Sequence, residues 1–148
     1  MEKLNLWGQE LEIDRDATID WYEKAGAWGC ECVPCKNFVS FARNRELPAP
    51  LLEALDSLGI PPEKATYVCE IVPKGHGNLY QFSYRIAGKK PDESAENFDL
   101  QPWGEPRCCH ETYPYGAPDF PEPHFDLEFW VVLPRWADAE QQEIGKDD

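Results

Sequence analysis

Residues 66–86 read TYVCEIVPKGHGNLYQFSYRI, and this stretch decides the fold. Its first part, Thr66 to Val72, is rich in β-branched and aromatic residues, which is typical of a strand. Its last part alternates apolar and polar side chains from Tyr80 to Ile86, the pattern of a half-buried strand. The glycines within residues 74–78 predict a hairpin loop between them. Strands joined by so short a loop pair antiparallel.

Two helices are predicted upstream of this hairpin. The first begins at or near Pro34, because proline suits the first helical turn, and its apolar face holds Phe38, Phe41 and Ala42. The second begins near Pro50, and its apolar face is a stripe of Leu51, Leu52, Leu55 and Leu58. Gly59 can take the left-handed conformation that ends a helix, and the two prolines that follow it prevent continuation.

The N-terminal segment predicts strand material. Leu11 and Ile13 form one short apolar alternation, and Ile19 and Trp21 form another. The charged residues 14–16 between these pairs indicate a turn. Strands are therefore expected on both sides of residues 14–16.

The second half of the chain predicts a loop, a long strand and a tail. Residues 101–123 contain six prolines, and a segment lacking so many N–H donors is neither a helix nor a central strand. We therefore expect a Pro-rich loop there. The apolar alternation from Phe125 to Leu133 predicts a strand. Residues 137–148 are charged, and we expect them to fray.

Together these elements predict a single α+β domain over residues 1–148. Its antiparallel sheet has about four or five strands. Its two helices follow the N-terminal strand material.

Charge and hydropathy narrow the classes of partner. The net charge is −14, and residues 91–148 hold 15 acidic but only 3 basic side chains. So negative a surface repels phosphate backbones, which argues against a nucleic-acid partner. One interpretation is that the acidic surface serves solubility. The alternative is that it binds a basic protein partner, and the chain is then an acidic inhibitor or antidote. No apolar run reaches the ~20 residues of a membrane span, so no membrane partner is expected.

The run Cys30-Glu31-Cys32-Val33-Pro34-Cys35 carries half of the six cysteines. Residues 1–10 have no apolar signal-peptide core, so we expect a cytoplasmic protein with reduced thiols. There, close cysteine spacing is typical of metal binding, and zinc takes four Cys or His ligands. Cys30, Cys32 and Cys35 are the expected zinc ligands with Cys109 as the fourth. Cys108 and His110 are its alternatives.

Two other interpretations of the cysteines stay open. Residues 28–36, WGCECVPCK, resemble the tryptophan-then-CxPC-lysine motif of thioredoxin-like proteins. That resemblance implies a thiol-disulfide oxidoreductase with Cys32 as the nucleophile and Cys35 as the resolving thiol. The later sequence departs from the family, because Pro73 follows a predicted strand instead of preceding one. Alternatively, the thiols are reduced and simply packed as small apolar groups.

A broader resemblance covers residues 28–86. The segment C-x-C-x-x-C-K-N-F at 30–38 and LGIPPEK at 58–64 are similar to a group of small uncharacterised bacterial proteins. The resemblance implies no activity. The sequence also lacks the Gly-x-Ser-x-Gly, HExxH and EF-hand patterns. We therefore expect a non-enzymatic protein or interaction module with a cysteine cluster that holds a structural metal.

Overall fold

The computed structural model describes residues 1–90, 98–99, 101–109 and 116–134. Within these ranges three helices and one antiparallel sheet of six strands confirm the α+β class. The elements in chain order are β1 (Glu2–Leu6), β2 (Gln9–Ile13), α1 (Arg15–Lys24), α2 (Val33–Arg43), α3 (Ala49–Leu58), β3 (Tyr67–Lys74), β4 (Gly77–Lys89), β5 (Glu105–Cys109) and β6 (His124–Pro134). The prediction was therefore one helix short, and the sheet is larger than the expected four or five strands.

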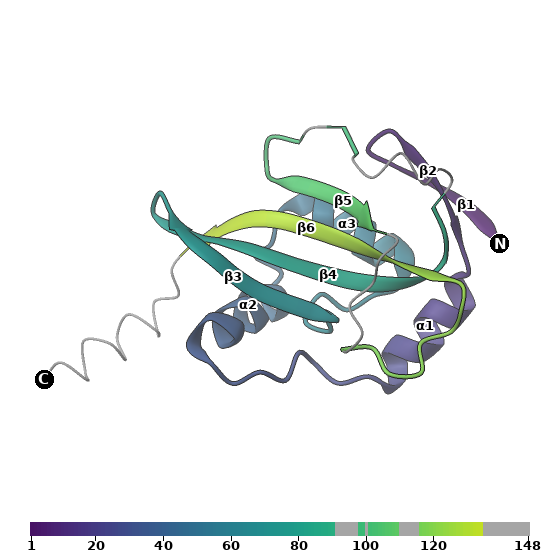
Figure 1. Cartoon of the computed structure of the whole chain (residues 1–148), viewed down its shortest axis with the longest axis horizontal. Coiled ribbons are helices and arrows are strands. Elements are labelled where there is room, and N and C mark those ends of the chain that lie inside the picture. Colours follow the sequence, from purple (N-terminus) through teal and green to yellow (C-terminus); the bar gives the residue numbers. More distant parts are fainter. Residues whose placement is uncertain (91–97, 100, 110–115, 135–148) are drawn as a thin grey trace, which may run out of the picture.

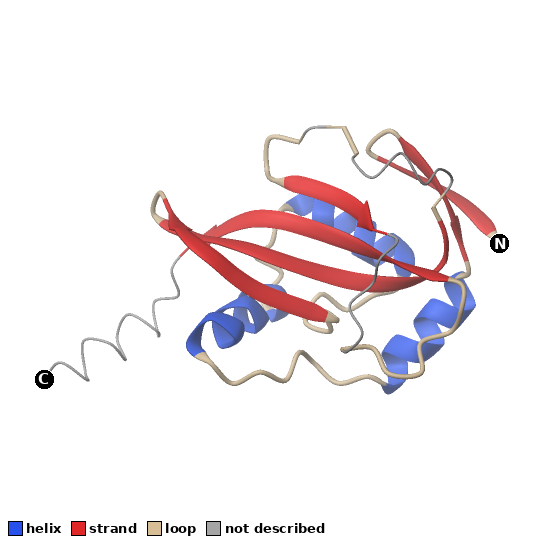
Figure 2. Ribbon diagram, viewed as in Figure 1, coloured by secondary structure: helices blue, strands red, loops and turns tan. Residues whose placement is uncertain are grey.

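β4 and β6 form the centre of the sheet (Figure 2). They pair antiparallel from Gly77 opposite Pro134 to Ala87 opposite His124. The apolar residues of β4 predicted to share one face are fully buried, and they are Tyr80, Phe82, Tyr84 and Ile86. Their cross-strand partners on β6 are apolar as well, so the two strands form one continuous apolar face.

The predicted hairpin between β3 and β4 is confirmed. Lys74 pairs with Gly77, which leaves Gly75 and His76 as the turn. Gly75 has a φ of 61°, a left-handed conformation that glycine adopts without a steric penalty. β3 lies on the side of β4 opposite β6 and has no other strand partner among the described residues.

The three helices lie on one side of the sheet, and α3 runs behind β4 and β6 (Figure 1). The ring of Phe38 on α2 lies 4.8 Å from that of Phe82 on β4. The predicted leucine stripe of α3 is buried, and Gly59 ends this helix with a φ of 71°. No helix among the described residues is long and apolar enough to cross a membrane.

The prediction of strands on both sides of residues 14–16 was half right. Leu11 and Ile13 are fully buried on β2, but Ile19 and Trp21 lie on helix α1. Asp14 caps this helix, because its side chain accepts a hydrogen bond of 3.1 Å from the backbone N–H of Ala17. The buried residues of α1 are Thr18 and Tyr22, four positions apart, so the helical period overrides the short alternation.

β4 is more deeply buried than the predicted half-buried strand. On its face away from the helices, Ser83 and Arg85 are also buried. Arg85 pairs with Asp126, its cross-strand neighbour on β6, at 3.0 Å. The polar side chains of Gln81 and Arg85 therefore serve contacts within the sheet, because Gln81 donates to Glu128 Oε1 at 2.6 Å and Arg85 pairs with Asp126. They do not mark a solvent-facing surface.

The predicted Pro-rich loop at 101–123 is interrupted by strand β5. Residues 105–109 pair with β6, and Pro106 lies opposite Phe129. β5 is an edge strand of the sheet, one of the positions in a sheet that tolerate proline. The segment is therefore not a central strand, as expected, but the expected loop is interrupted by an edge strand. Residues 110–115 and the predicted frayed tail 137–148 lie outside the described residues.

The Asp14 cap gives a test of helix α1. Replacing Asp14 with Ala removes the acceptor for the Ala17 N–H, and we expect the free energy of unfolding to fall by about 1 kcal/mol. Asp14→Asn keeps an acceptor and should stay close to the unsubstituted protein. Urea unfolding followed by circular dichroism measures both. Equal stability of the alanine and asparagine variants would contradict the assigned cap.

Candidate functional site

The three clustered cysteines lie where the segment after α1 enters α2. Cys32 is the N-cap residue of α2, and Cys35 lies in its first turn beside Pro34. The helix therefore begins at Val33, close to the predicted start at Pro34. Cys30 precedes the cap in an irregular segment that begins at Ala25.

The sulfurs of Cys30, Cys32 and Cys35 all lie within 4.8 Å of one another. The Cys30 and Cys32 sulfurs are 3.3 Å apart. Tetrahedral zinc with Zn–S bonds of about 2.3 Å separates its sulfurs by about 3.8 Å. Three vertices of such a tetrahedron therefore fit this cluster with small adjustments. The structure thus brings together three of the four cysteines expected to bind zinc.

The three thiols differ in their surroundings. Cys30 and Cys32 are exposed, whereas Cys35 is buried. The backbone N–H of Cys32, followed by the Cys32 and Cys35 thiols, stabilises the Cys30 thiolate and lowers its pKa. Burial raises the pKa of Cys35 to about 12, despite a hydrogen bond from the Trp28 indole. Of these two thiols Cys30 is therefore the more readily ionised, whereas the thioredoxin-like motif would assign the nucleophile to Cys32.

Trp28 holds the irregular segment before α2 against the cluster. Its indole Nε1 donates to the Cys35 sulfur at 3.2 Å, and its backbone N–H donates to the Glu63 carbonyl at 2.9 Å. Its ring also packs edge-on against Tyr67 of β3, with 6.3 Å between centroids. Trp28 thereby connects the buried Cys35 thiol to β3 and to Glu63, in the segment between α3 and β3.

A buried hydrogen-bond chain anchors the first turn of α2 to the sheet. The Tyr80 hydroxyl on β4 donates to the Pro34 carbonyl at 2.9 Å, and it accepts from Asn37 Nδ2 at 3.0 Å. Burial raises the pKa of Tyr80 to about 12, so the hydroxyl keeps its proton at neutral pH. Asn37 is thus tied to the sheet.

Cys109, the fourth expected zinc ligand, lies elsewhere in the structure. It pairs with Asp126 on the sheet face away from the helices, and its sulfur lies 3.9 Å from Glu128 Oε2. β5 is separated from β3 by β6 and β4, whereas α2 lies against β3. The structure therefore does not bring Cys109 to the other three thiols. Cys108 and His110 were the alternatives to Cys109 as the fourth zinc ligand. Cys108 is buried on β5, and His110 lies outside the described residues.

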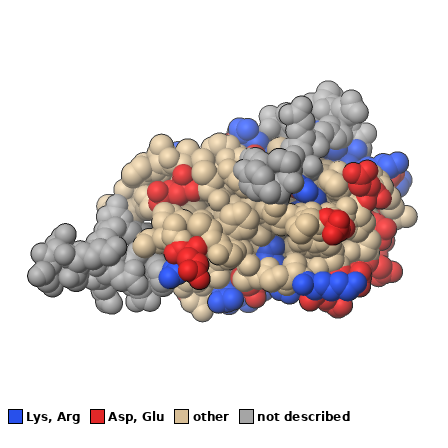
Figure 3. Space-filling model, turned by 60° about the horizontal axis from the view of Figure 1, so that its bottom comes forward, with Lys and Arg blue, Asp and Glu red and all other residues tan. Residues whose placement is uncertain are grey.

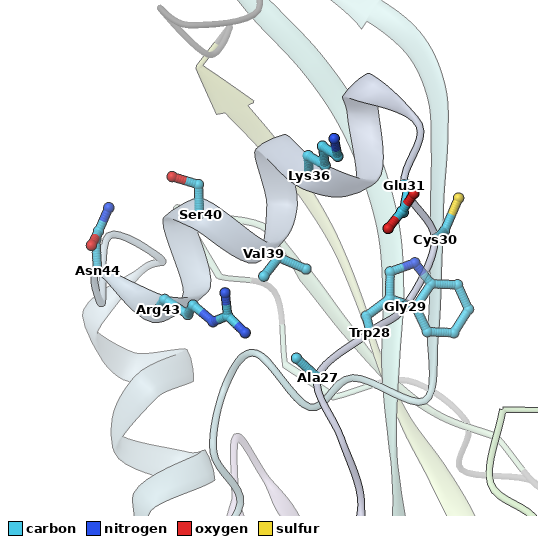
Figure 4. Close-up of a pocket in the computed structure, with 10 residues that line it drawn as sticks. All are labelled: Ala27, Trp28, Gly29, Cys30, Glu31, Lys36, Val39, Ser40, Arg43 and Asn44. Carbon is cyan, nitrogen blue, oxygen red and sulfur yellow. The ribbon is translucent and has the colours of Figure 1, made fainter.

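A groove runs along the cluster, between α2 and the segment that precedes it (Figure 4). Its volume is about 440 Å³. We call it the α2 groove, and its lining residues are Ala27, Trp28, Gly29, Cys30, Glu31, Lys36, Val39, Ser40, Arg43 and Asn44. Cys30 belongs both to this groove and to the thiol cluster. Cysteine spacing alone did not reveal the groove.

The acidic C-terminal part of the chain, residues 91–148, contributes little to the described surface. Of the 15 acidic residues within 91–148, nine lie outside the described residues. Two of the others, Asp126 and Glu128, are buried. On the face in Figure 3, the described acidic and basic side chains are interspersed. The basic-partner interpretation therefore depends mainly on residues outside the described part.

No protein-family model, curated protein or solved structure matches this chain. The resemblance of residues 28–86 to the group of small bacterial proteins therefore stays a prediction.

The unequal thiols give a second test. In metal-free protein at neutral pH we expect iodoacetamide to alkylate Cys30 first, because its lowered pKa supplies thiolate. Cys35 and Cys108 should react last, since burial raises the pKa of each to about 12. Mass spectrometry of peptides at timed intervals gives the order, with urea-unfolded protein as the control. Equal rates for Cys30 and Cys35 in the folded protein would contradict these environments.

Proposed function

We propose that this protein binds one thiophilic metal ion, with zinc as the first candidate, through Cys30, Cys32 and Cys35. The observation that carries the proposal is that the three sulfurs lie within 4.8 Å of one another. Thiolates select soft or borderline ions such as Zn²⁺ and Cu⁺ over Mg²⁺ and Ca²⁺. Metal binding, without catalysis, is the role assigned to the site.

The surroundings of the thiols support this role. Cys35 is held by Trp28 and by the anchored first turn of α2, so one ligand is fixed before the ion arrives. Partners that orient a ligand in this way strengthen metal binding. Cys30 and Cys32 are exposed, which gives the ion access from solvent. With three protein ligands, a tetrahedral ion keeps one position for an exchangeable ligand.

Titration with Zn²⁺ and with Co²⁺ as a spectroscopic substitute tests the proposal. We expect one ion per chain, and stabilisation by about 2.7 kcal/mol when the free ion is at about 100 times its Kd. Loss of a residue that only hydrogen-bonds to a metal ligand weakens metal binding roughly 10- to 100-fold. We expect a larger loss of affinity when a ligand itself is replaced, as in Cys30→Ser, Cys32→Ser and Cys35→Ser. Cys69→Ser is the matched control. Unchanged affinity in the three variants would exclude the site.

Cys109→Ser decides the fourth ligand. Cys109 lies beside Glu128, so we expect this substitution to leave the metal affinity unchanged. A loss comparable to that of Cys32→Ser would instead assign the fourth thiolate to Cys109 and require β5 to move.

Metal binding should also depend on pH. Burial raises the pKa of Cys35 to about 12, so this thiol is protonated at neutral pH and must release its proton to the solvent when the ion binds. The apparent affinity should therefore rise with pH, by up to about tenfold per pH unit for each proton released. Calorimetry in buffers of different ionisation enthalpy counts the protons. Binding without proton release would contradict thiolate ligation.

A second candidate function is thiol-disulfide exchange between Cys30 and Cys32. Their sulfurs are 3.3 Å apart, and Cys30 has the lowered pKa. An external disulfide would accept two electrons and two protons from the pair and become two thiols. Mapping of the oxidised peptide separates this pair from the Cys32–Cys35 pair of the thioredoxin-like motif. Slow and equal alkylation of all six thiols would remove this candidate.

A further inference from the structure

We propose that the α2 groove binds a small thiol that carries carboxylates, and that the sulfur of this thiol becomes the fourth ligand of the bound metal ion. The inference rests on the proposed metal site and names the ligand that completes it. Binding transfers the thiol proton to the solvent, breaks the bond of the ion to the exchangeable fourth ligand, which leaves to the solvent, and forms one sulfur–metal bond. No electron is transferred.

The groove has the size and position for such a ligand. Its volume of about 440 Å³ falls within the range of about 300–1,000 Å³ typical of small-molecule sites. One wall is a single face of α2, where Lys36, Val39 and Arg43 follow at helical spacing. The other wall is the segment from Ala27 to Glu31 (Figure 4).

The charges of the groove favour an anionic ligand. The chain has a net charge of −14, and four of its arginines are ion-paired, namely Arg15, Arg45, Arg85 and Arg107. Lys36 and Arg43 have no ion pair among the described residues. Glu31 is the one acidic residue among the described residues that line the groove. Lys36 and Arg43 therefore give the lining a net positive charge. A carboxylate can accept two parallel hydrogen bonds from Arg43.

The position of Cys30 indicates why the ligand should be a thiol. Cys30 lines the groove and belongs to the cluster, so a ligand in the groove lies beside the ion. A fourth thiolate matches the soft ion that three thiolates select. Lys36 and Arg43 are seven residues apart, about 10 Å along the helix axis. An extended compound of tripeptide length spans that distance.

Glutathione added to the cobalt-loaded protein tests the inference. We expect a saturable increase in the thiolate-to-cobalt absorption, and no increase with S-methylglutathione, which lacks a free thiol. Lys36→Gln/Arg43→Gln should weaken glutathione binding about tenfold or more, because it removes charge-assisted hydrogen bonds. Its cobalt affinity should stay unchanged, since neither side chain belongs to the thiol cluster.

Lys74→Gln/Lys89→Gln is the matched control. It removes the same charge from exposed positions that do not line the groove, so it should bind glutathione as the unsubstituted protein does. Glutathione binding that is equal in both double variants would overturn the inference and leave the metal site intact. An unchanged cobalt spectrum with glutathione would overturn it as well. A protein that binds no cobalt or zinc would overturn the proposed function itself.

Discussion

The antiparallel pairing of β4 with β6 is the constraint on which the rest of the structure depends. It extends from Gly77 opposite Pro134 to Ala87 opposite His124, and its apolar face carries the helical layer. Hydroxyl groups fix that layer to the sheet at defined points. Tyr80 donates to the carbonyl of Pro34 in the first turn of α2. Tyr84 donates to the carbonyl of Pro62, shortly after the end of α3. Such hydrogen bonds contribute about 1 kcal/mol each and also fix the position of the helices.

The parts of the fold that local pattern dictates were predictable from the sequence. The β3–β4 hairpin and the leucine face of α3 depend on residues that are neighbours in the chain, and both predictions are confirmed. Helix α1 was missed, because Ile19 and Trp21 alternate like a strand while the cap at Asp14 and the helical spacing of Thr18 and Tyr22 decide otherwise. β5 was missed because its proline is acceptable only at an edge, and an edge position is a property of the whole sheet.

In the candidate site, too, the features set by local spacing were predictable and those set by the strand order were not. The spacing of Cys30, Cys32 and Cys35 predicts a local cluster, and the structure brings their sulfurs together. Cys109 was expected beside them from residue type alone, but the strand order places β5 far from α2. The partner of Asn37 is Tyr80, 43 residues further along the chain. Sequence spacing cannot reveal such a contact, because it exists only after β4 has paired.

The segment before α2 contains two glycines, Gly26 and Gly29, on the N-terminal side of Cys30. Gly26 and Gly29 face open space, because a Cβ added to either would meet no neighbouring atom within 4 Å, so close packing does not explain them. Glycine gives a chain its greatest conformational freedom, and Cys30 loses that freedom when its sulfur is fixed. Cys35 is already buried and loses little. For an ion bound to the cluster, this entropic asymmetry would favour capture on Cys35 and earlier release from Cys30.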